Sequence, residues 1–494
     1  MSDALHTSTV TARVCQIWFT QSVSIIWHTV ELNDALNVIL PFIQSGGFQQ
    51  PSIPHPWHRF CLYAKYVRFL KCFDINSPNL EKAVGWEPCK NIFKLSSRLT
   101  VLHWRGVEKH IDCLPSFLTP TLQLLHISLD VITKPKKIDD LFKSIATRSP
   151  SLFALQLVIP FVKSHGLTVS HSLQELIQAL SQLVSVDVPI NLVTPDLFTI
   201  LSKLPNLEDL TLFESTDDYD IQKEEAFYKW SIKQSGKGKE NEDSTKEELL
   251  PFPSLRDFYI SDMLHNQSFT VAKALKHGVQ FLKLSSLTCS PYYEESDQIV
   301  ELMKSVHVVC PNLREIKLHQ TDSPVDDIPW AAILPLLQCL ELHTLHVDSC
   351  TVNMGLKDLV SLTTNRPFWK NVGLPSTVPL SYRALITFAQ NCPNIVKLSL
   401  TLDPHLNFPD LAKFKTEVSL PSLTVLDVKN SYLTETSQIK IGLFLASICK
   451  NPLEIQSYGG GKSSWQYIQK MVNYIIKLKK EVTQLRQSVK KALE

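Results

Sequence analysis

The sequence predicts an α/β solenoid, in which short parallel strands and outer helices repeat along the chain. The stretches CPNLREIKL at 310–318 and CPNIVKLSL at 392–400 are nearly the same. Both contain the frame apolar-x-x-apolar-x-apolar. Copies with Leu, Ile or Val at all three places begin at Leu122, Leu152, Leu183, Leu207, Val279, Leu313, Leu342, Ile395 and Leu423. Copies with an aromatic residue or Cys substituted begin at Val67, Leu99, Leu255 and Trp369. All but one of the gaps between successive starts lie between 23 and 34 residues, which predicts a repeat.

Each frame predicts one strand, and a helical run precedes many of them. The alternation x-apolar-x-apolar-x is that of a short strand with one apolar face. In IDDLFKSIATRSPSL (138–152) the preceding apolar residues recur at intervals of three and four, as in a helix. A proline such as Pro150 then ends the helix and starts an extended segment. Because one strand and one helix cannot bury their apolar faces alone, we expect stacked units with a continuous core over residues 57–455.

Composition and charge narrow the classes of protein to consider. Hydrophobic residues make up 44% of the 494 residues, and 49 basic residues nearly balance 48 acidic ones. This balance does not indicate a nucleic-acid or membrane partner. The 11 cysteines contain no C-x-x-C pair, so we expect reduced thiols. The first residues lack the basic and apolar regions of a signal peptide, and no apolar run is long enough to span a membrane. We therefore expect a cytoplasmic or nuclear protein.

Motifs for catalysis or for cofactors are missing from the sequence. It contains no G-x-x-x-x-G-K-[ST], no G-x-G-x-x-G and no H-E-x-x-H. GGGKSS at 459–464 lacks the spacing of a phosphate-binding loop, and the histidines of HPWH at 55–58 have no carboxylate or cysteine at ligand spacing. We expect no enzymatic activity, no cofactor and no metal.

The repeat units resemble leucine-rich repeats. LHTLHVDSCTVNMGLKDL (342–359) comes closest to the consensus of that family, with Cys350 eight residues after Leu342. Most other units lack the consensus Asn or Cys at this place, so we expect an irregular solenoid. Periodicity alone leaves another α/β repeat open. The resemblance implies a leucine-rich-repeat solenoid with a curved parallel sheet and outer helices, which acts by protein–protein interaction.

The concave face of the sheet is the candidate binding surface. In each strand the x positions point away from the core, and charged or aromatic side chains there can bind a protein. The candidate residues are Arg105, Asp209, Phe213, Tyr259, Lys283, Lys317, His319, His346 and Asp348. A solenoid also needs a polar strand face for solubility, so the hypothesis concerns the surface as a whole. The substrate protein cannot be named from the sequence.

The segment before the repeats predicts a helical cap over residues 1–56. In RVCQIWFTQSVSIIWHTVEL (13–32) apolar residues recur every three to five positions, and the run ends in an extended Val-x-Leu. The open end of the first unit needs such a cover.

The same segment also resembles the last helix of an F-box. The pattern is V-C-x-x-W, then eight residues, then W-x-x-V-x-L, and WHRFCLYAKYVRFLKCF (57–73) resembles the link between F-box and repeats in fungal F-box/leucine-rich-repeat proteins. This resemblance implies a substrate receptor of a Skp–cullin–F-box ubiquitin ligase that docks on the Skp adaptor. Its adaptor-side residues would be Val14, Cys15, Trp18, Ile26 and Trp27. Only twelve residues precede Arg13, and the Leu-Pro start of an F-box is not among them. Adaptor binding therefore stays open, and the alternative is a leucine-rich-repeat scaffold with no ligase link.

Two further segments stand apart from the repeats. Residues 217–250 are rich in charge, and we expect a disordered insertion.

Residues 462–494 carry an apolar heptad pattern whose candidate core is Ile468, Met471, Ile475, Leu478, Val482, Leu485 and Val489. β-Branched residues at a with Leu at d favour a parallel coiled-coil homodimer. The alternative is a single amphipathic helix packed over the last repeat, and the pattern does not decide between them.

Overall fold

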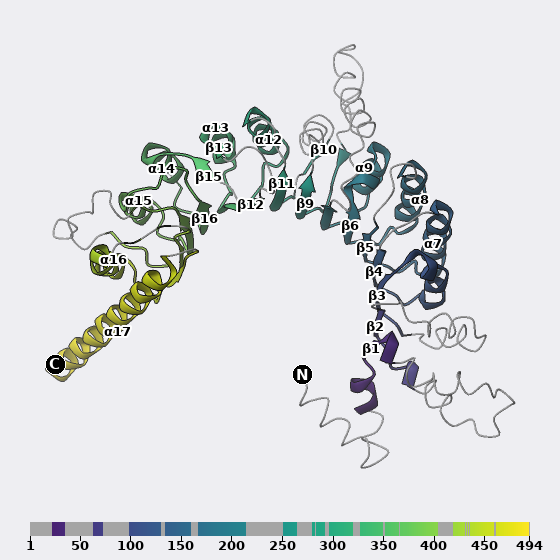
Figure 1. Ribbon diagram of the computed structural model, residues 1–494, viewed down its shortest axis with the longest axis horizontal. Coiled ribbons are helices and arrows are strands. Elements are labelled where there is room, and N and C mark those ends of the chain that lie inside the picture. Colours follow the sequence, from purple (N-terminus) through teal and green to yellow (C-terminus); the bar gives the residue numbers. More distant parts are fainter. Residues whose placement is uncertain are drawn as a thin grey trace, which may run out of the picture. The chain divides into compact units, whose positions relative to one another are not determined.

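A computed structural model describes much of the chain and divides it into two compact units, Met1–Leu255 (unit 1) and Arg256–Glu494 (unit 2) (Figure 1). The described residues are 22–34, 63–72, 98–129, 134–159, 166–213, 250–263, 279–281, 283–291, 296–319, 327–348, 351–364, 366–403, 418–429, 431, 433, 435–458 and 461–493.

Unit 1 is built on parallel strands that pair in chain order. They are β1 (Thr29–Glu31), β2 (Phe69–Cys72), β3 (Val101–Gly106), β4 (Leu124–Leu129), β5 (Ala154–Val158), β6 (Ser185–Pro189) and β7 (Asp209–Phe213). Parallel neighbours need a crossover connection, which here is often helical. The helices of the unit are the 3-10 helices η2 (Glu108–Phe117) and η4 (Ile190–Leu192) and the α-helices α7 (Pro135–Arg148), α8 (Gly166–Ala179) and α9 (Pro195–Ser202). A two-residue strand, β8 (Leu250–Pro251), lies near the end of the unit.

Unit 2 repeats the same arrangement. Its parallel strands are β9 (Asp257–Met263), β11 (Ser286–Pro291), β12 (Glu315–His319), β14 (Thr344–Asp348), β16 (Asn371–Leu374), β17 (Lys397–Leu400), β18 (Val425–Asp427) and β19 (Glu454–Gln456). Its helices are α12 (Ser296–Val309), α13 (Trp330–Ile333), η5 (Leu334–Gln338), α14 (Leu356–Thr363), α15 (Arg383–Asn391), α16 (Glu435–Ile448) and α17 (Lys462–Leu493). Strands β13 (Asp327–Pro329) and β15 (Thr351–Asn353) form a small parallel pair, and β10 is Val279–Gln280.

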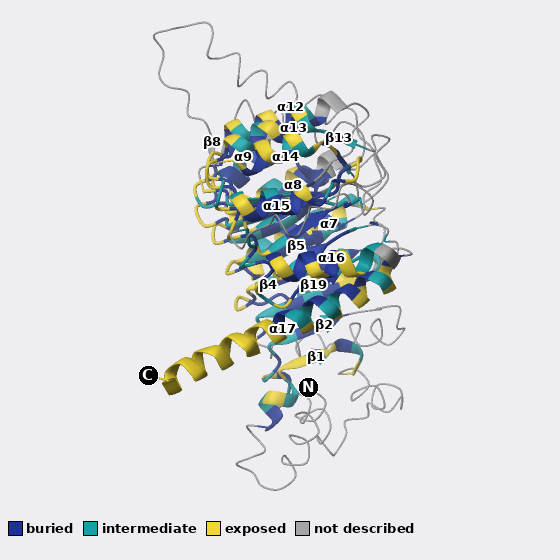
Figure 2. Ribbon diagram, turned by 90° about the vertical axis from the view of Figure 1, so that its left-hand side faces the viewer, coloured by how far each residue is buried: buried dark blue, intermediate teal, exposed yellow. Residues whose placement is uncertain are grey.

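The core of each unit is a ladder of apolar residues in register across the strands. In unit 2 the ladder runs through Phe258, Leu287, Ile316, Leu345, Val372, Leu398, Leu426 and Ile455, all buried. A slip by one residue would turn a strand's apolar side chains away from the helices, so the frame fixes the register. Figure 2 shows the buried residues gathered on the strands and on the helix faces against them. Each unit is a leucine-rich-repeat solenoid, which confirms the predicted fold class.

One predicted repeat was wrong by five residues. The frame placed at Val279 would put a strand over 281–285, whereas β11 begins at Ser286 and uses Leu284, Leu287 and Cys289 as its frame. The true copy contains a Cys, and this thiol is buried as a small apolar group. As a consequence Lys283, a candidate binding residue, lies in the turn before β11 and not on a strand.

The W-x-x-V-x-L pattern at the start of the chain is the first repeat frame. Val30 of β1 pairs with Leu70 of β2, the second apolar position of the next frame, and Leu32 is buried. Residues 22–26 are helical, and the Trp27 ring stacks on Tyr63 with 4.9 Å between ring centroids. The other adaptor-side candidates, Val14, Cys15 and Trp18, lie outside the described residues, as does the insertion as far as residue 249.

The cysteines within the described ranges are free thiols in apolar surroundings. They are Cys72, Cys113, Cys289, Cys310, Cys339, Cys392 and Cys449. Burial raises the pKa of the Cys289 and Cys449 thiols to about 12, so both stay protonated at neutral pH.

None of the described helices has both the length and the apolar content that crossing a membrane requires.

Candidate functional site

The candidate site lies on the helix-free face of the sheet in unit 2. Figure 1 shows helices α12 to α16 on one side of these strands, so the alternate side chains point to the other side. There the strands bring together one continuous row from Thr288 through Lys317, His346 and Ser399 to Asp427. A second row, two residues further along, contains His319 and Asp348 as direct neighbours.

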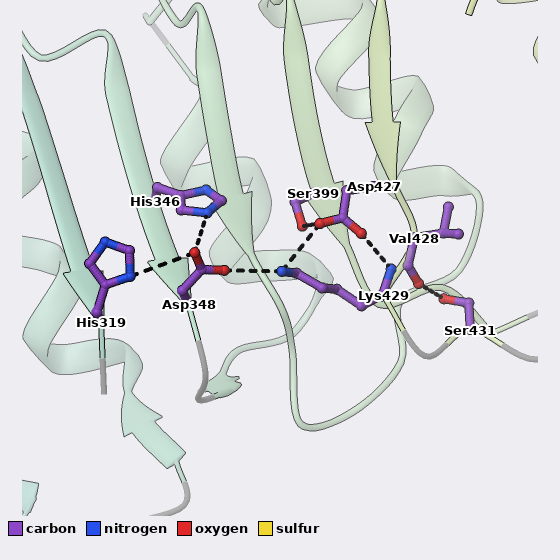
Figure 3. Close-up of polar contacts among 8 residues, drawn as sticks. All are labelled: His319, His346, Asp348, Ser399, Asp427, Val428, Lys429 and Ser431. Atoms are coloured by element: carbon purple, nitrogen blue, oxygen red, sulfur yellow. Dashed lines mark hydrogen bonds and ion pairs between the residues drawn. The ribbon is translucent and has the colours of Figure 1, made fainter. Parts of the chain in front are cut away.

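Asp348 is the centre of a polar network on this face (Figure 3). Its Oδ2 lies 3.1 Å from Nε2 of His346 and 3.6 Å from Nδ1 of His319. Its Oδ1 accepts a hydrogen bond from Nζ of Lys429 at 3.1 Å. The carboxylate of Asp348 thus holds three cationic or imidazole side chains that come from β12, from β14 and from the turn after β18.

Asp427 anchors the far side of the network (Figure 3). Nζ of Lys429 lies 3.2 Å from Oδ2 of Asp427, and the Ser399 hydroxyl donates to the same oxygen at 3.0 Å. The backbone N–H of Lys429 donates to Oδ1 at 2.9 Å. Asp427 is only 3% exposed, although its place in the frame predicts an exposed side chain. The buried carboxylate therefore orients Lys429 toward Asp348.

Gly373 of β16 makes room for His346. It stands directly opposite His346 in the neighbouring strand. A Cβ atom at Gly373 would come within 2.1 Å of Nδ1 of His346, so any side chain there would displace the imidazole. The ring thus lies over the bare backbone of β16, which places its Nε2 beside Asp348.

Lys429 has a backbone conformation that is rare for a residue with a side chain. Its φ is +49°, in the left-handed region, and it is the one non-glycine residue with positive φ in the described part of the chain. Such a conformation costs about 1 kcal/mol and persists where the surroundings fix it. Here the Asp427 carboxylate and a hydrogen bond from Tyr458 N–H to the Lys429 carbonyl fix it. Nζ also lies 5.7 Å from the Tyr458 ring centroid, in reach of a cation–π interaction.

The charges of the network shift the pKa of its members. Burial lowers the pKa of His346, and Asp348 offsets this only in part, so the imidazole is neutral at pH 7 and donates a hydrogen bond. Burial raises the pKa of Asp348, but His346 and Lys429 together lower it by more, and the net direction is down. Burial lowers the pKa of Lys429, but Asp427 and Asp348 outweigh it, so the ammonium is stabilised. The site presents a carboxylate, an ammonium and two imidazoles in fixed positions.

The other predicted residues do not all join this site. Lys317 lies beside it on β12 and pairs with Glu315 at 2.6 Å. Tyr259 of β9 is in the row of Lys317, two strands away, or about 10 Å at the usual strand spacing. It is exposed. Arg105, Asp209 and Phe213 lie on β3 and β7 of unit 1.

The sequence frame did not single out the residues that organise the network. Asp427 and Lys429 are x positions of the Leu423 frame, so the sequence placed both on the concave face, but nothing in the frame distinguishes a buried carboxylate from a solvated one. Ser399 and Gly373 were missed, because a small residue on a strand has meaning only beside its partner in the next strand. Within the described residues, no three His, Cys, Asp or Glu side chains are arranged to hold a metal ion.

The helix-free face of unit 1 carries a ladder of aromatic rings. The His103 ring makes edge contacts with Phe69 at 4.7 Å and with His126 at 5.2 Å between centroids. Nζ of Lys71 lies over the Phe69 ring at 5.3 Å. Burial lowers the pKa of both His103 and His126, with a further lowering of His103 by Lys71 and of His126 by His103.

The lowered histidine pKa values predict that acid destabilises the protein. A base with a folded pKa below its unfolded pKa binds more protons when unfolded, so stability is complete above about pH 6.5 and falls as pH falls below it. We expect a lower Tm at pH 5 than at pH 7.5, measured by circular dichroism. His126→Phe should reduce this difference, and replacement of the exposed His171 in α8 by Gln is the control. A difference unchanged by His126→Phe would contradict the assignment.

Comparisons with known proteins give distant likenesses to solved structures and no sequence relative. No protein-family model and no curated protein sequence matches the chain. Among solved structures, an internalin (inlF) from Listeria monocytogenes str. 4b F2365 aligns with 75% of this chain and 83% of its own, at 14% identity and a TM-score of 0.37. TLR13 in a complex with ssRNA13 aligns with 75% of this chain and 42% of its own, at 13% identity and a TM-score of 0.37. The yeast Rad7 and Elc1 complex contains a chain that aligns over 94% of this chain and 98% of its own, at 13% identity and a TM-score of 0.34. Likeness at this level says nothing about function.

Proposed function

We propose that the chain is a non-enzymatic interaction protein that binds a protein target on the helix-free face of unit 2. The observation that carries this proposal is the network around Asp348 and Lys429. Five strands or strand ends contribute to it, and a rare backbone conformation is maintained at Lys429. A face needed only for solubility would not require charged groups held in fixed positions.

The chemistry of this face suits a polar segment of a protein with an aromatic or acidic anchor. Lys317 and His319 are partly exposed next to the network, and the exposed Tyr259 ring lies in the same row. Pre-oriented charges select a partner and set its register, while an exposed tyrosine supplies contact area at a low entropic cost. The described groups are already paired with one another, so they act by recognition and positioning.

We further propose that this interaction serves a Skp–cullin–F-box ubiquitin ligase, with the chain as its substrate receptor. The support is the resemblance of the V-C-x-x-W and W-x-x-V-x-L patterns to the end of an F-box. In this arrangement the segment around Trp18 and Trp27 faces the Skp adaptor, and the face around Asp348 holds the target. In this role the chain catalyses nothing itself. It holds the target protein where the ligase can modify it.

Co-purification tests both parts of the proposal at once. The tagged full chain is incubated with a purified Skp adaptor and a cell extract, and retained proteins are quantified by mass spectrometry. We expect Val14→Glu with Trp18→Ala to lose the adaptor and keep the targets. Lys317→Glu with His319→Glu should keep the adaptor and retain the targets about tenfold less or worse, because the variant opposes the charge of the face.

The control for the face variant is Lys304→Glu, which changes the charge in the same direction on helix α12, at an exposed position on the other side of the unit. It should retain the adaptor and the targets like the natural chain. An unchanged set of targets on Lys317→Glu with His319→Glu would refute this face as the binding site. Failure of the natural chain to retain the adaptor would refute the ligase link and favour a scaffold.

A further inference from the structure

Helix α17 divides at residue 476 into two halves with different surroundings. In the first half Trp465, Ile468, Val472 and Ile476 form a buried stripe that packs on α16 and β19. In the second half the apolar side chains stay 41–84% exposed, namely Leu478, Val482, Leu485, Val489 and Leu493. Figure 2 shows this change from buried to exposed along α17. The first half is thus a single amphipathic helix packed over the last repeat, one of the two alternatives that the sequence left open.

The first half closes the end of the solenoid. Asn473 accepts a hydrogen bond from Leu453 N–H at 2.7 Å and donates to the Leu453 carbonyl at 3.0 Å. Gln469 accepts from Ile455 N–H at 2.6 Å. These side chains satisfy backbone groups of Leu453, just before β19, and of Ile455 within it, at the last strand in the sheet order, whose edge would otherwise be open. Lys479 donates to the Ala446 carbonyl at 2.9 Å just beyond the division.

Beyond Lys479 the helix leaves the solenoid, and the second half still carries a regular apolar stripe that is exposed. Leu478, Val482, Leu485 and Val489 recur at intervals of four, three and four, the a and d positions of a heptad. An apolar stripe that is exposed on one face of a helix is stabilised when another surface removes it from water. Val at a and Leu at d are the residues that favour a two-stranded parallel coiled coil.

The charges beside the stripe distinguish the possible partners. Glu481 occupies position g, and Lys479 and Arg486 occupy successive e positions. In a parallel pair Glu481 of one copy meets Arg486 of the other, twice by symmetry. In an antiparallel pair the e positions face each other, so Lys479 would meet Arg486 with like charge. The remaining lysines of this half lie at b, c and f, away from the seam, at 477, 480, 490 and 491. Among the described residues of one chain, the ion pair that Glu481 makes is a long contact of 3.9 Å to Lys477.

We propose that residues 477–493 of two copies of this chain form a short parallel coiled coil. This dimer does not depend on the proposed function, because its contact surface is α17 and not the face around Asp348. The seam covers little more than two heptads, so the dimer is weak and forms at micromolar concentrations. Pairing two copies would present two target-binding faces together, which raises the apparent affinity for a partner with repeated sites.

Sedimentation equilibrium of the full chain tests the dimer. We expect a rise from the 56.0 kDa monomer toward twice that mass as the concentration increases from about 1 to 100 μM. Val482→Glu with Leu485→Glu should remain monomeric over the same range. Gln484→Glu, at an outer c position of the same exposed segment, is the matched control and should dimerise like the natural chain. Because all three positions are exposed, the Tm of the monomer should not change.

Charge exchange tests the parallel arrangement. Glu481→Arg and Arg486→Glu should each weaken the dimer about fivefold, and the two together should restore it, because the e–g′ pair is re-formed with reversed signs. A natural chain that stays monomeric at 100 μM would overturn the proposal, as would a dimer that survives Val482→Glu with Leu485→Glu. Binding of the monomeric chain to vesicles of anionic lipid, lost on the same substitutions, would assign the stripe to a membrane surface instead.

Discussion

Replacement of Trp465 by alanine is expected to lower the free energy of unfolding by about 3–5 kcal/mol. The indole is fully buried between the first half of α17 and the last repeats of unit 2. Its Nε1–H donates to the Ser431 carbonyl at 2.8 Å, and the Ser431 hydroxyl in turn accepts from Leu402 N–H at 2.8 Å. The substitution therefore removes a large apolar contact and also leaves the Ser431 carbonyl without this donor.

Urea denaturation followed by circular dichroism measures this loss. Tyr467→Ala is the control, because Tyr467 lies on the same helix two residues away and is 53% exposed. Its free energy of unfolding should stay within about 0.5 kcal/mol of the natural chain. Equal effects of the two substitutions would show that α17 is not anchored by its indole. Trp465→Phe should fall between them, since it keeps much of the volume and loses the donor.

The behaviour of α17 shows where sequence reasoning reaches its limit. The coiled-coil interpretation and the single-helix interpretation of residues 462–494 both require an apolar residue at Ile468 and another about two turns later. The heptad predicts Met471 and Ile475 as core, whereas the buried stripe runs through Val472 and Ile476. Periods of 3.5 and 3.6 residues separate only over several turns, so a helix of this length does not distinguish them by pattern. Contacts with α16 and β19 decide the matter, and these are not local in sequence.

The strands were predictable for the opposite reason. Their period of two is strict, one face is buried, and the frame therefore fixes both position and register. The error at Val279 came from a Cys in a core position at Cys289. The first frame, at Trp27, was assigned to an F-box pattern, although its Val30 also pairs in register with the next repeat. The same residues can fit the end of an F-box and the frame of a repeat strand, so the sequence alone does not distinguish these two assignments.

The candidate site was only partly predictable. His319, His346 and Asp348 follow from their positions in the strand frames. Their organisation depends on side chains in neighbouring strands, including a missing side chain at Gly373 and the turn at Lys429. These relations join residues about 25–80 positions apart in the chain, as in the Lys429–Asp348 pair. The pairing register of neighbouring strands decides which of these side chains meet. That register is seen in the structure and is not given by the order of residues in one strand.

Removal of the Asp427 carboxylate is expected to cost about 3 kcal/mol of unfolding free energy. Asp427→Ala leaves the buried Ser399 hydroxyl and the Lys429 N–H without their acceptor, at about 1–3 kcal/mol for each buried group. The strained backbone at Lys429 then loses one of the contacts that maintain it. Urea denaturation measures the change, and Asp257→Ala on β9 is the control, because this carboxylate is exposed on the same sheet.

A double substitution separates the lost hydrogen bonds from the general effect of removing a charge. Ser399→Ala with Asp427→Ala removes the orphaned hydroxyl together with its acceptor, so its cost should be about 1 kcal/mol less than the sum of the single costs. Simple additivity would contradict the hydrogen bond between the two side chains. If Asp427→Ala cost no more than Asp257→Ala, the carboxylate would not be an anchor. Lys429 would then owe its conformation to the turn alone, and the network would no longer support a binding site on this face.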